Sequence, residues 1–290
     1  MKILIAFKYS VLRTLKIWKA VLLIWFSSLL TAGMIGIPLK RALKAGFSNS
    51  TITERLAHGI RPEVFSDLGP VLKSMMSYIS GGLLFAILVW FLLNVVFTGG
   101  LFHSLSKTEN KFMIRNFLGD SAKKFWSFLV INIIMSLITA VVVFIIIVLP
   151  VNIITSSGTP DEGVLIKTVR ILVLVFLVIL PLLLLAADYA RAWQAAHSKN
   201  ECFRAIGFGF GNTFRTLFIS WTAMVAILIV QVLFGWLVLS ILPAYIPEKG
   251  GGVFLLFLLS QFLFFVKIML KVWRYGSVTS LMEQKKAKAG

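Results

Sequence analysis

Long runs of apolar residues without a single charge alternate along the chain with shorter polar segments that are rich in Lys and Arg. A membrane-spanning helix needs about 20 apolar residues, because each residue rises about 1.5 Å and the hydrocarbon core is about 30 Å thick. The runs at residues 20–39, 74–102, 125–160, 171–187, 216–247 and 250–266 are near or above that length. They predict six spans, at about 20–39, 79–102, 121–149, 165–187, 216–242 and 251–270.

The same runs indicate helices and not strands. A strand in lipid alternates apolar and polar residues, whereas residues 141–149, 171–180 and 253–259 are apolar at every position. A helix tolerates lipid on all sides because its backbone hydrogen bonds are satisfied within the segment. The predicted fold class is therefore all-α, a polytopic transmembrane helical bundle with six spans in three hairpins, and residues 1–290 form a single membrane domain.

The polar segments between the spans predict amphipathic surface elements. In residues 1–19, five basic side chains fall within an arc of about 140° at 100° per residue, which predicts an interfacial N-terminal helix. The alternative is that these charges only flank the first span. Residues 40–74 form the longest polar loop, predicted to be amphipathic and external, and residues 276–290 form a polar, disordered cytoplasmic tail.

Four local signals refine the expected helix boundaries. Asp120 is placed to cap the start of the third span, and Pro150 is placed to end it. Pro181 interrupts the fourth span and predicts a kink. The glycine-rich run at residues 207–211 predicts a flexible turn.

Composition excludes several classes of protein. The chain is 59% apolar and 14% charged, against about 25% charged residues in a soluble domain, so no separate soluble domain is expected. The single cysteine excludes an internal disulfide and a Cys-rich metal site, and the three histidines lack metal-ligand spacing. We therefore expect no metal and no cofactor.

The net charge of +18 reflects 29 basic and 11 acidic residues. Twenty of the basic residues lie on one side of the membrane if the N-terminus is inside, so both termini are predicted to be cytoplasmic. Anionic lipid head groups attract such residues by about 1 kcal/mol each, which makes membrane lipids the expected partner, together with other membrane proteins. No base-reading module accompanies the charge, so nucleic acid is not expected.

Few polar residues within or beside the spans are candidates for function. Asp188 is the one carboxylate at the edge of a span, and Arg191 follows three residues later. One interpretation makes Asp188 a coupling or gating acid; the interpretation we prefer is an ion pair at the head groups. Arg170 near the outer end of the fourth span either is functional or snorkels to the surface. Asn94 and Gln231 either line a solute path or, as we prefer, hydrogen-bond between helices.

Two resemblances follow from short motifs. Glu201 and Gly207 have the spacing of the inner-loop motif of importer-type ABC permeases, but Cys202 and Phe203 replace its two alanines and its hydrophobic-Pro ending is missing. The layout as a whole resembles uncharacterised six-helix bacterial membrane proteins, through Pro38-Leu39 after the first span and the motif at 97–100 at the end of the second. That resemblance implies the bacterial cytoplasmic membrane and no established activity.

The sequence thus leaves two main hypotheses for function. The first is a non-catalytic scaffold or accessory subunit of a membrane complex. The alternative is a transporter or permease subunit for a small or lipidic solute, in which the break at Pro181 permits helical hairpins to rock. A lipid-modifying enzyme is a third option for which the sequence offers no catalytic base, so we expect no catalytic residues.

Overall fold

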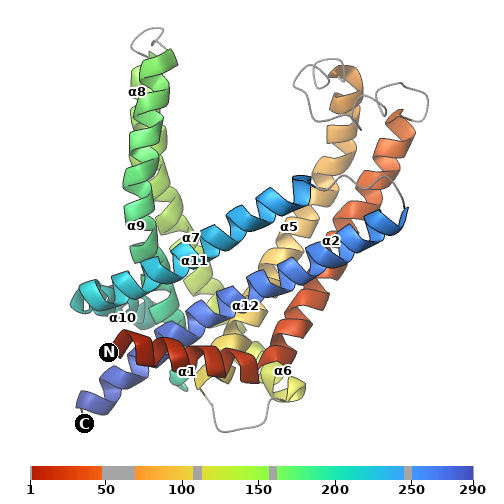
Figure 1. Ribbon diagram of the computed structural model, residues 1–290. Helices are drawn as coiled ribbons and strands as arrows, with labels where there is room; N and C mark the ends of the chain where they lie inside the picture. Colours follow the sequence, from red (N-terminus) through yellow and green to blue (C-terminus); the bar gives the residue numbers. More distant parts are fainter. Residues whose placement is uncertain (1, 48–68, 107–112, 157–161, 245–249, 290) are drawn as a thin grey trace. The chain divides into compact units, whose positions relative to one another are not determined.

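The protein is all-α in the computed structural model, which describes residues 2–47, 69–106, 113–156, 162–244 and 250–289. The predicted fold class is confirmed. The described elements are helices α1 (Lys2–Lys16), α2 (Trp18–Phe47), α5 (Gly69–Ser106), α6 (Ile114–Lys123) and α7 (Phe125–Val143), the π-helical turn η1 (Phe144–Val148), and helices α8 (Leu149–Ser156), α9 (Glu162–Ala196), α10 (Cys202–Arg215), α11 (Leu217–Ala244) and α12 (Gly250–Ala289) (Figure 1).

Five stretches of helix within the described residues are long and apolar enough to cross a membrane. A sixth candidate is the bent pair formed by Tyr9–Lys16 and Trp18–Met34. By helix length and hydropathy, the chain is therefore a multi-pass membrane protein with five or six candidate spans. The five stretches are Leu84–Ser106, Phe125–Ser156, Gly163–Ala196, Leu217–Ile241 and Gly250–Gln284.

The chain divides into two compact units. The larger unit comprises Met1–Leu22 and Val95–Gly290, and the smaller unit comprises Leu23–Asn94, which holds most of α2 and the first part of α5. The predicted polar loop at 40–74 belongs to the smaller unit, where its two ends are helical as parts of α2 and α5. Its centre, residues 48–68, lies outside the described residues.

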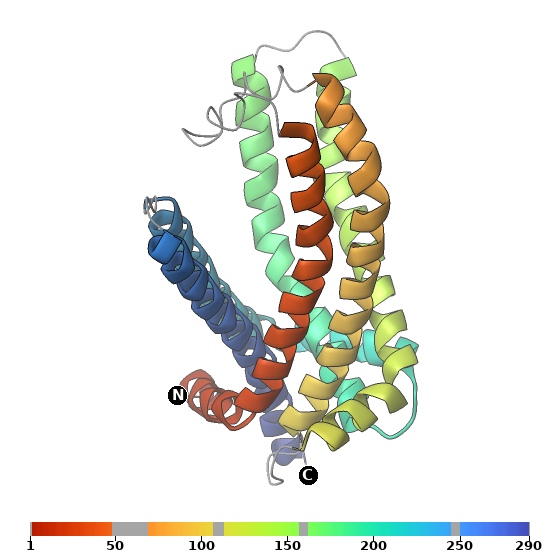
Figure 2. The ribbon, with the colours of Figure 1, turned by 90° about the vertical axis from the view of Figure 1, so that its right-hand side faces the viewer.

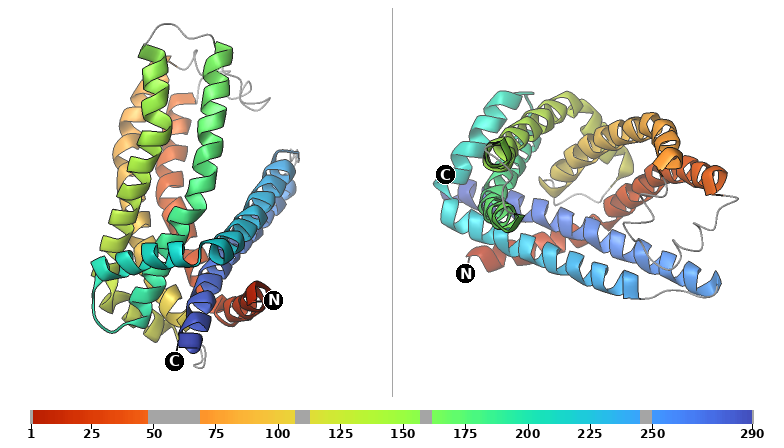
Figure 3. Two further views of the ribbon diagram at one scale, coloured as in Figure 1. Left: turned by 90° about the vertical axis from the view of Figure 1, so that its left-hand side faces the viewer. Right: turned by 90° about the horizontal axis from the view of Figure 1, so that it is seen from above.

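Within the larger unit, α7, α9, α11 and α12 bury side chains along only one half of their length. On α7 to α8 the last buried residue is Met135, and on α9 the first is Pro181. On α11 the last described buried residue is Ile227, and on α12 the first is Leu263. These limits divide each helix into a part with buried residues and a part without them. The parts with buried residues, which include Ile131, Asp188, Met224 and Tyr275, are together called the packed end. The parts without buried residues are called the distal halves. In pairs, α7 lies beside α9 and α11 beside α12 (Figure 3).

The helix of the third predicted span continues past Pro150 to Ser156, so the prediction that Pro150 ends this helix is wrong. Proline has no N–H and its ring collides with the carbonyl four residues earlier in an α-helix. Here the turn before it is the wider π-helix η1, in which the backbone N–H of Leu149 reaches the carbonyl oxygen of Phe144, five residues back. Pro150 then lies in the first turn of α8, where a missing N–H has no cost.

The start of that span also differs from the prediction. Asp120 lies inside α6 and does not cap α7, because the break between the two helices falls at Lys124. The ammonium group of Lys124 instead donates to the carbonyl oxygens of Gln194, Ala195 and His197, at 3.0, 2.9 and 2.6 Å. A cation at a helix C-terminus satisfies unpaired carbonyls and complements the helix dipole, so Lys124 ties α7 to the end of α9.

The C-terminal residues are helical, so the prediction of a disordered tail from residue 276 is wrong. α12 continues to Ala289 and packs against α1 (Figure 2). The hydroxyls of Ser10 and Ser277 are 2.9 Å apart, and Arg13 forms an ion pair with Glu283 at 2.7 Å. Polar side chains therefore hold the two helices together, while Leu12 of α1 is exposed. The N-terminal helix is confirmed as a helix; its place at a membrane surface stays a prediction.

The glycine-rich run predicted as a turn is helical and lies in α10. A Cβ atom at Gly209 would collide with the backbone carbonyl oxygen of Ala186 on α9, and it would lie 3.1 Å from the Ala190 nitrogen. A Cβ atom at Gly207 or Gly211 would meet nothing within 4 Å. Gly209 alone among the three therefore permits the close approach of α10 to α9.

We predict that Gly209→Ala lowers the thermal unfolding midpoint of the purified protein in detergent. The added methyl gains about 1 kcal/mol in helix propensity, but forcing two backbones apart costs about 1–3 kcal/mol, and here the obstacle is a carbonyl that cannot rotate away. Gly207→Ala is the matched control, because it gains the same propensity without a clash and leaves the midpoint unchanged or raised. Equal midpoints for the two variants would contradict the proposed close approach.

Candidate functional site

A cluster of charged and amide side chains is buried at the packed end of the larger unit. It consists of Asp188 and Arg191 on α9, Asn132 on α7 and Arg274 on α12, and we call it the ion cluster. The side chain of Asp188 is 0% exposed, and those of Arg191 and Arg274 are 15% and 11% exposed. Three of the candidate spans therefore meet at these four residues.

In the ion cluster, Oδ1 of Asp188 accepts a hydrogen bond, whereas Oδ2 is close to a cation without a hydrogen bond to it. Nη1 of Arg191 donates to Oδ1 of Asp188 at 2.9 Å, and Nε of Arg274 lies 3.0 Å from Oδ2. Arg191 turns its other edge to Asn132, so that Nε and Nη2 donate to Oδ1 of the amide at 3.0 and 2.6 Å. One carboxylate thus bridges two guanidinium groups, and an amide orients one of them.

The local cause of this arrangement is the spacing along α9. Residues three apart lie on neighbouring positions of the same helix face, so Asp188 and Arg191 pair without any distortion of the helix. Taking an ion out of water costs several kcal/mol unless it is paired and hydrogen-bonded. The pairing with Arg191 and Arg274 is what permits Asp188 to be fully buried.

Aromatic rings lie beside Arg274 of the ion cluster. Tyr275 is buried next to Arg274, with its ring centroid 4.7 Å from that of Phe102 on α5. The guanidinium carbon of Arg274 lies 5.1 Å from the Tyr275 ring centroid, and Nζ of Lys271 lies 5.8 Å from it, both over the ring. A cation is attracted to the negative face of an aromatic ring. The Tyr275 ring therefore stabilises these two cations.

The structure brings together only two of the residues predicted as functional candidates. Asp188 and Arg191 form an ion pair, and its place at the lipid head groups stays a prediction. Arg170 lies on the distal half of α9 and is exposed, and Gln231 on α11 donates to the carbonyl oxygen of Leu270 on α12 at 3.2 Å. Asn94 is half-buried on α5 and belongs to the smaller unit. The hydrogen bond of Gln231 matches the preferred interpretation of an interhelical contact.

Sequence reasoning missed Arg274, whereas the hydrogen bond of Asn132 with Arg191 is of the interhelical kind preferred for polar residues within the spans. The spacing of Arg274 from Lys267 and Lys271 is that of a basic helix end, so the sequence places this arginine among the twenty basic residues predicted on the cytoplasmic side. The signal that distinguishes it is the Tyr275-Gly276-Ser277 segment that follows, in which aromatic and small residues are typical of a packed helix face. All three residues of that segment are buried.

The chemistry available at the ion cluster is that of a clamp between helices. Breaking it would leave a buried charge unpaired, so its members favour one arrangement of α7, α9 and α12. A second close pair, Nε2 of His103 and Oδ2 of Asp120 at 2.8 Å, links α5 to α6 nearby in the larger unit. Among the described residues, no three His, Cys, Asp or Glu side chains are grouped as metal ligands.

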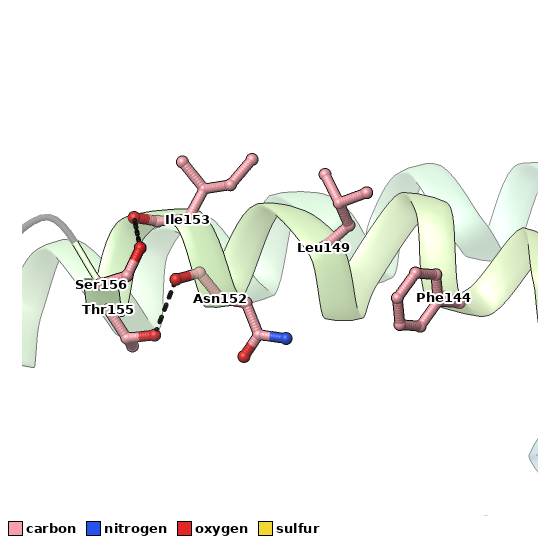
Figure 4. Close-up of a pocket in the computed structure, with 6 residues that line it drawn as sticks. All are labelled: Phe144, Leu149, Asn152, Ile153, Thr155 and Ser156. Carbon is pink, nitrogen blue, oxygen red and sulfur yellow. Dashed lines mark hydrogen bonds between the residues drawn. The ribbon is translucent and has the colours of Figure 1, made fainter.

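A shallow hollow lies on the distal half of α7 to α8, around the π-helical turn (Figure 4). Its polar side chains are Asn152, Thr155 and Ser156, and its apolar ones include Phe144 and Leu149. The hydroxyl of Thr155 donates to the carbonyl oxygen of Asn152 and that of Ser156 to the carbonyl oxygen of Ile153. These two hydroxyls are therefore committed to their own helix, and the hollow offers a ligand little beyond the Asn152 amide.

Comparisons of the chain with protein-family models, with curated proteins and with solved structures find no match. The resemblance to a bacterial six-helix family is therefore supported only as far as the multi-span helical layout.

We predict that Asp188→Asn destabilises the protein more than Arg274→Gln does. The first change leaves two buried arginines without a counter-ion, a situation that costs about 3–5 kcal/mol, whereas the second leaves the pair with Arg191 intact. The thermal unfolding midpoint in detergent measures both changes.

The double variant Asp188→Asn/Arg274→Gln completes the test. Because it removes the carboxylate together with one of the arginines, its loss is expected to be smaller than the sum of the two single losses. Arg204→Gln serves as a control, since the pair of Arg204 with Glu201 is largely exposed and such pairs contribute about 0–1 kcal/mol. Strictly additive losses would show that the ion cluster does not act as a unit.

Proposed function

We propose that this protein is a non-catalytic accessory or scaffold subunit of a membrane complex. The observation that carries the proposal is the contrast along α7, α9, α11 and α12. The packed end is fixed by a buried ion cluster, whereas the distal halves contain no buried residue among those the structure describes. The distal halves are apolar surfaces for neighbours in the membrane.

The composition of those surfaces supports this proposal. Large side chains that are more than one-third exposed recur on every distal half. Helix association in lipid depends on packing, on interhelical hydrogen bonds and on close approach. Helices that are held rigidly at one end can therefore pack against a partner span along the other end. Examples are Ile145 and Ile153 on η1 and α8, Leu174 and Val178 on α9, Leu233 and Trp236 on α11, and Phe254 and Leu258 on α12.

The proposal predicts that a photo-crosslinking amino acid at Leu174 or Trp236 captures another membrane protein in native membranes. The substituted positions are exposed, so the change leaves the packed end intact. The expected result is a discrete adduct of higher mass on a denaturing gel, identified by mass spectrometry.

The matched control is the same crosslinker at Phe203 of α10, which is also exposed but lies outside the distal halves. A partner seated on the distal halves gives an adduct at Leu174 or Trp236 that differs from any adduct at Phe203. Lipid adducts alone, together with migration of the native protein as a single chain in mild detergent, would contradict an accessory role.

A transporter or permease subunit is the second candidate, and one observation favours it. Pro181 is the first buried residue of α9, so the break in its hydrogen bonding coincides with the boundary between the packed end and the distal half. A proline removes one backbone hydrogen bond and is a common cause of a kink. Rocking of a distal half about this point, with the ion cluster as the fixed end, would suit a solute pathway.

Flux measurements in liposomes separate the two candidates. If the chain forms a pathway on its own, purified protein raises the uptake of a solute panel above that of empty liposomes, and Pro181→Ala lowers the rate by restoring a continuous helix. Arg170→Ala, on the exposed distal half, is the accompanying control and leaves the rate unchanged. Uptake equal to that of empty liposomes for every solute would count against a self-contained transporter.

A further inference from the structure

Helix α10 presents three distinct faces when its residues are projected at 100° per residue. One face is buried and consists of Ala205, Gly209, Asn212 and Thr213. A second face is aromatic: Phe203, Phe210 and Phe214 fall within about 40° of one another, and Phe203 and Phe214 are 74% and 67% exposed. The third face holds two exposed arginines, Arg204 and Arg215, about 100° away from the centre of the aromatic face.

Contacts with α9 fix the direction in which these faces point. Gly209 lies against the backbone of Ala186 and Ala190, and the ring centroids of Trp193 and Phe208 are 6.0 Å apart. α10 therefore lies across the end of α9 with its buried face inward (Figure 3). On the other two faces, Phe203, Phe214, Arg204 and Arg215 are exposed and Phe210 is half-buried.

The chain connections place α10 at a membrane boundary. α9 ends at Ala196 and α11 begins at Leu217, and both helices are candidate spans. A single residue, Thr216, separates α10 from α11, and the backbone N–H of Ser220 already donates to the Thr216 carbonyl. A 14-residue helix tethered this closely to the ends of two spans has no room to move away from the boundary they share.

The net charge of residues 199–215 indicates which kind of surface this segment binds. Residues 199–215 contain Lys199, Arg204 and Arg215 against one carboxylate, Glu201, which pairs with Arg204 at 3.1 Å. The segment is therefore net positive and all three cations are exposed. Anionic lipid head groups complement such a surface, and the aromatic side chains suit the boundary between head groups and acyl chains.

We propose that α10 is an interfacial helix that binds anionic phospholipid. Its phenylalanine face enters the boundary between head groups and acyl chains, and Arg204 and Arg215 bind lipid phosphates. The proposal rests on the membrane location of the chain and stands whether or not the protein is an accessory subunit. It follows from the separation of aromatic and basic residues onto two faces of a helix whose third face is held by α9.

The test uses the full chain, carrying Cys202→Ser and Gly207→Cys, labelled with a bimane fluorophore and reconstituted in vesicles. Gly207 lies between the aromatic and arginine faces, and an added side chain there meets nothing within 4 Å. Quenching is compared between brominated phosphatidylglycerol and brominated phosphatidylcholine at equal mole fraction. We expect both lipids to quench the label and phosphatidylglycerol to be preferred about fivefold or more, because each surface arginine contributes a factor of about five.

Two variants assign the effect to the two faces. Arg204→Gln/Arg215→Gln lowers the preference for phosphatidylglycerol, with Lys199 as the remaining cation of the segment, and Phe203→Ser/Phe214→Ser lowers quenching by both lipids. Arg170→Gln, which removes an exposed arginine from the distal half of α9, is the control and keeps the preference. Unfolding midpoints confirm that each variant is folded.

Three outcomes would overturn the proposal. One is equal quenching by the two lipids in the labelled chain without substitutions on its aromatic or arginine face. Another is a preference that Arg204→Gln/Arg215→Gln leaves undiminished. The third is a label that neither lipid quenches, which would make α10 a surface for water or for a protein. None of these outcomes bears on crosslinking at Leu174 or Trp236, so failure here is distinguishable from failure of the accessory role.

Discussion

The cost of burying a charge in a medium of low polarity governs the arrangement of the larger unit. Asp188 is fully buried, and its ionised form is tolerable only where cations and hydrogen-bond donors replace water. Arg191 meets part of this need from the same helix, but the second oxygen requires Arg274 from α12. Because Asn132 of α7 then orients Arg191, one carboxylate determines which ends of three helices lie together.

The rest of the packed end is consistent with that constraint. Lys124 donates hydrogen bonds to the last carbonyls of α9, and Gly209 permits α10 to lie against α9. The hydroxyls of Ser10 and Ser277 join α1 to α12. Each is a polar or small residue used at a close contact, the means by which helices associate where apolar surface alone gives no driving force. The distal halves expose large apolar side chains instead, and Gln231, which donates to the Leu270 carbonyl, is a polar exception on α11.

The sequence was sufficient for the helical class and for the presence of five or six candidate spans, because the absence of charge over about 20 residues is a strong and local signal. It was also sufficient for the pair of Asp188 with Arg191, which depends on spacing within one helix. It failed for Arg274, since the partner of a buried charge on another helix has no fixed sequence separation. It failed at Pro150 and in the glycine-rich run of α10 because a π-helical turn and a close contact with α9 override local propensity.

The contact of α10 with α9 links the proposed lipid surface to the ion cluster. Gly209 touches the backbone at Ala186 and Ala190, and Asp188 lies between these two residues on α9. A force that lifts or rolls α10 is therefore applied to the same turn of helix that carries the carboxylate. Because a buried ion cluster has few alternative geometries of similar free energy, this turn resists displacement. An anionic membrane surface that holds α10 in place would accordingly stabilise the ion cluster from outside, without any contact between lipid and carboxylate.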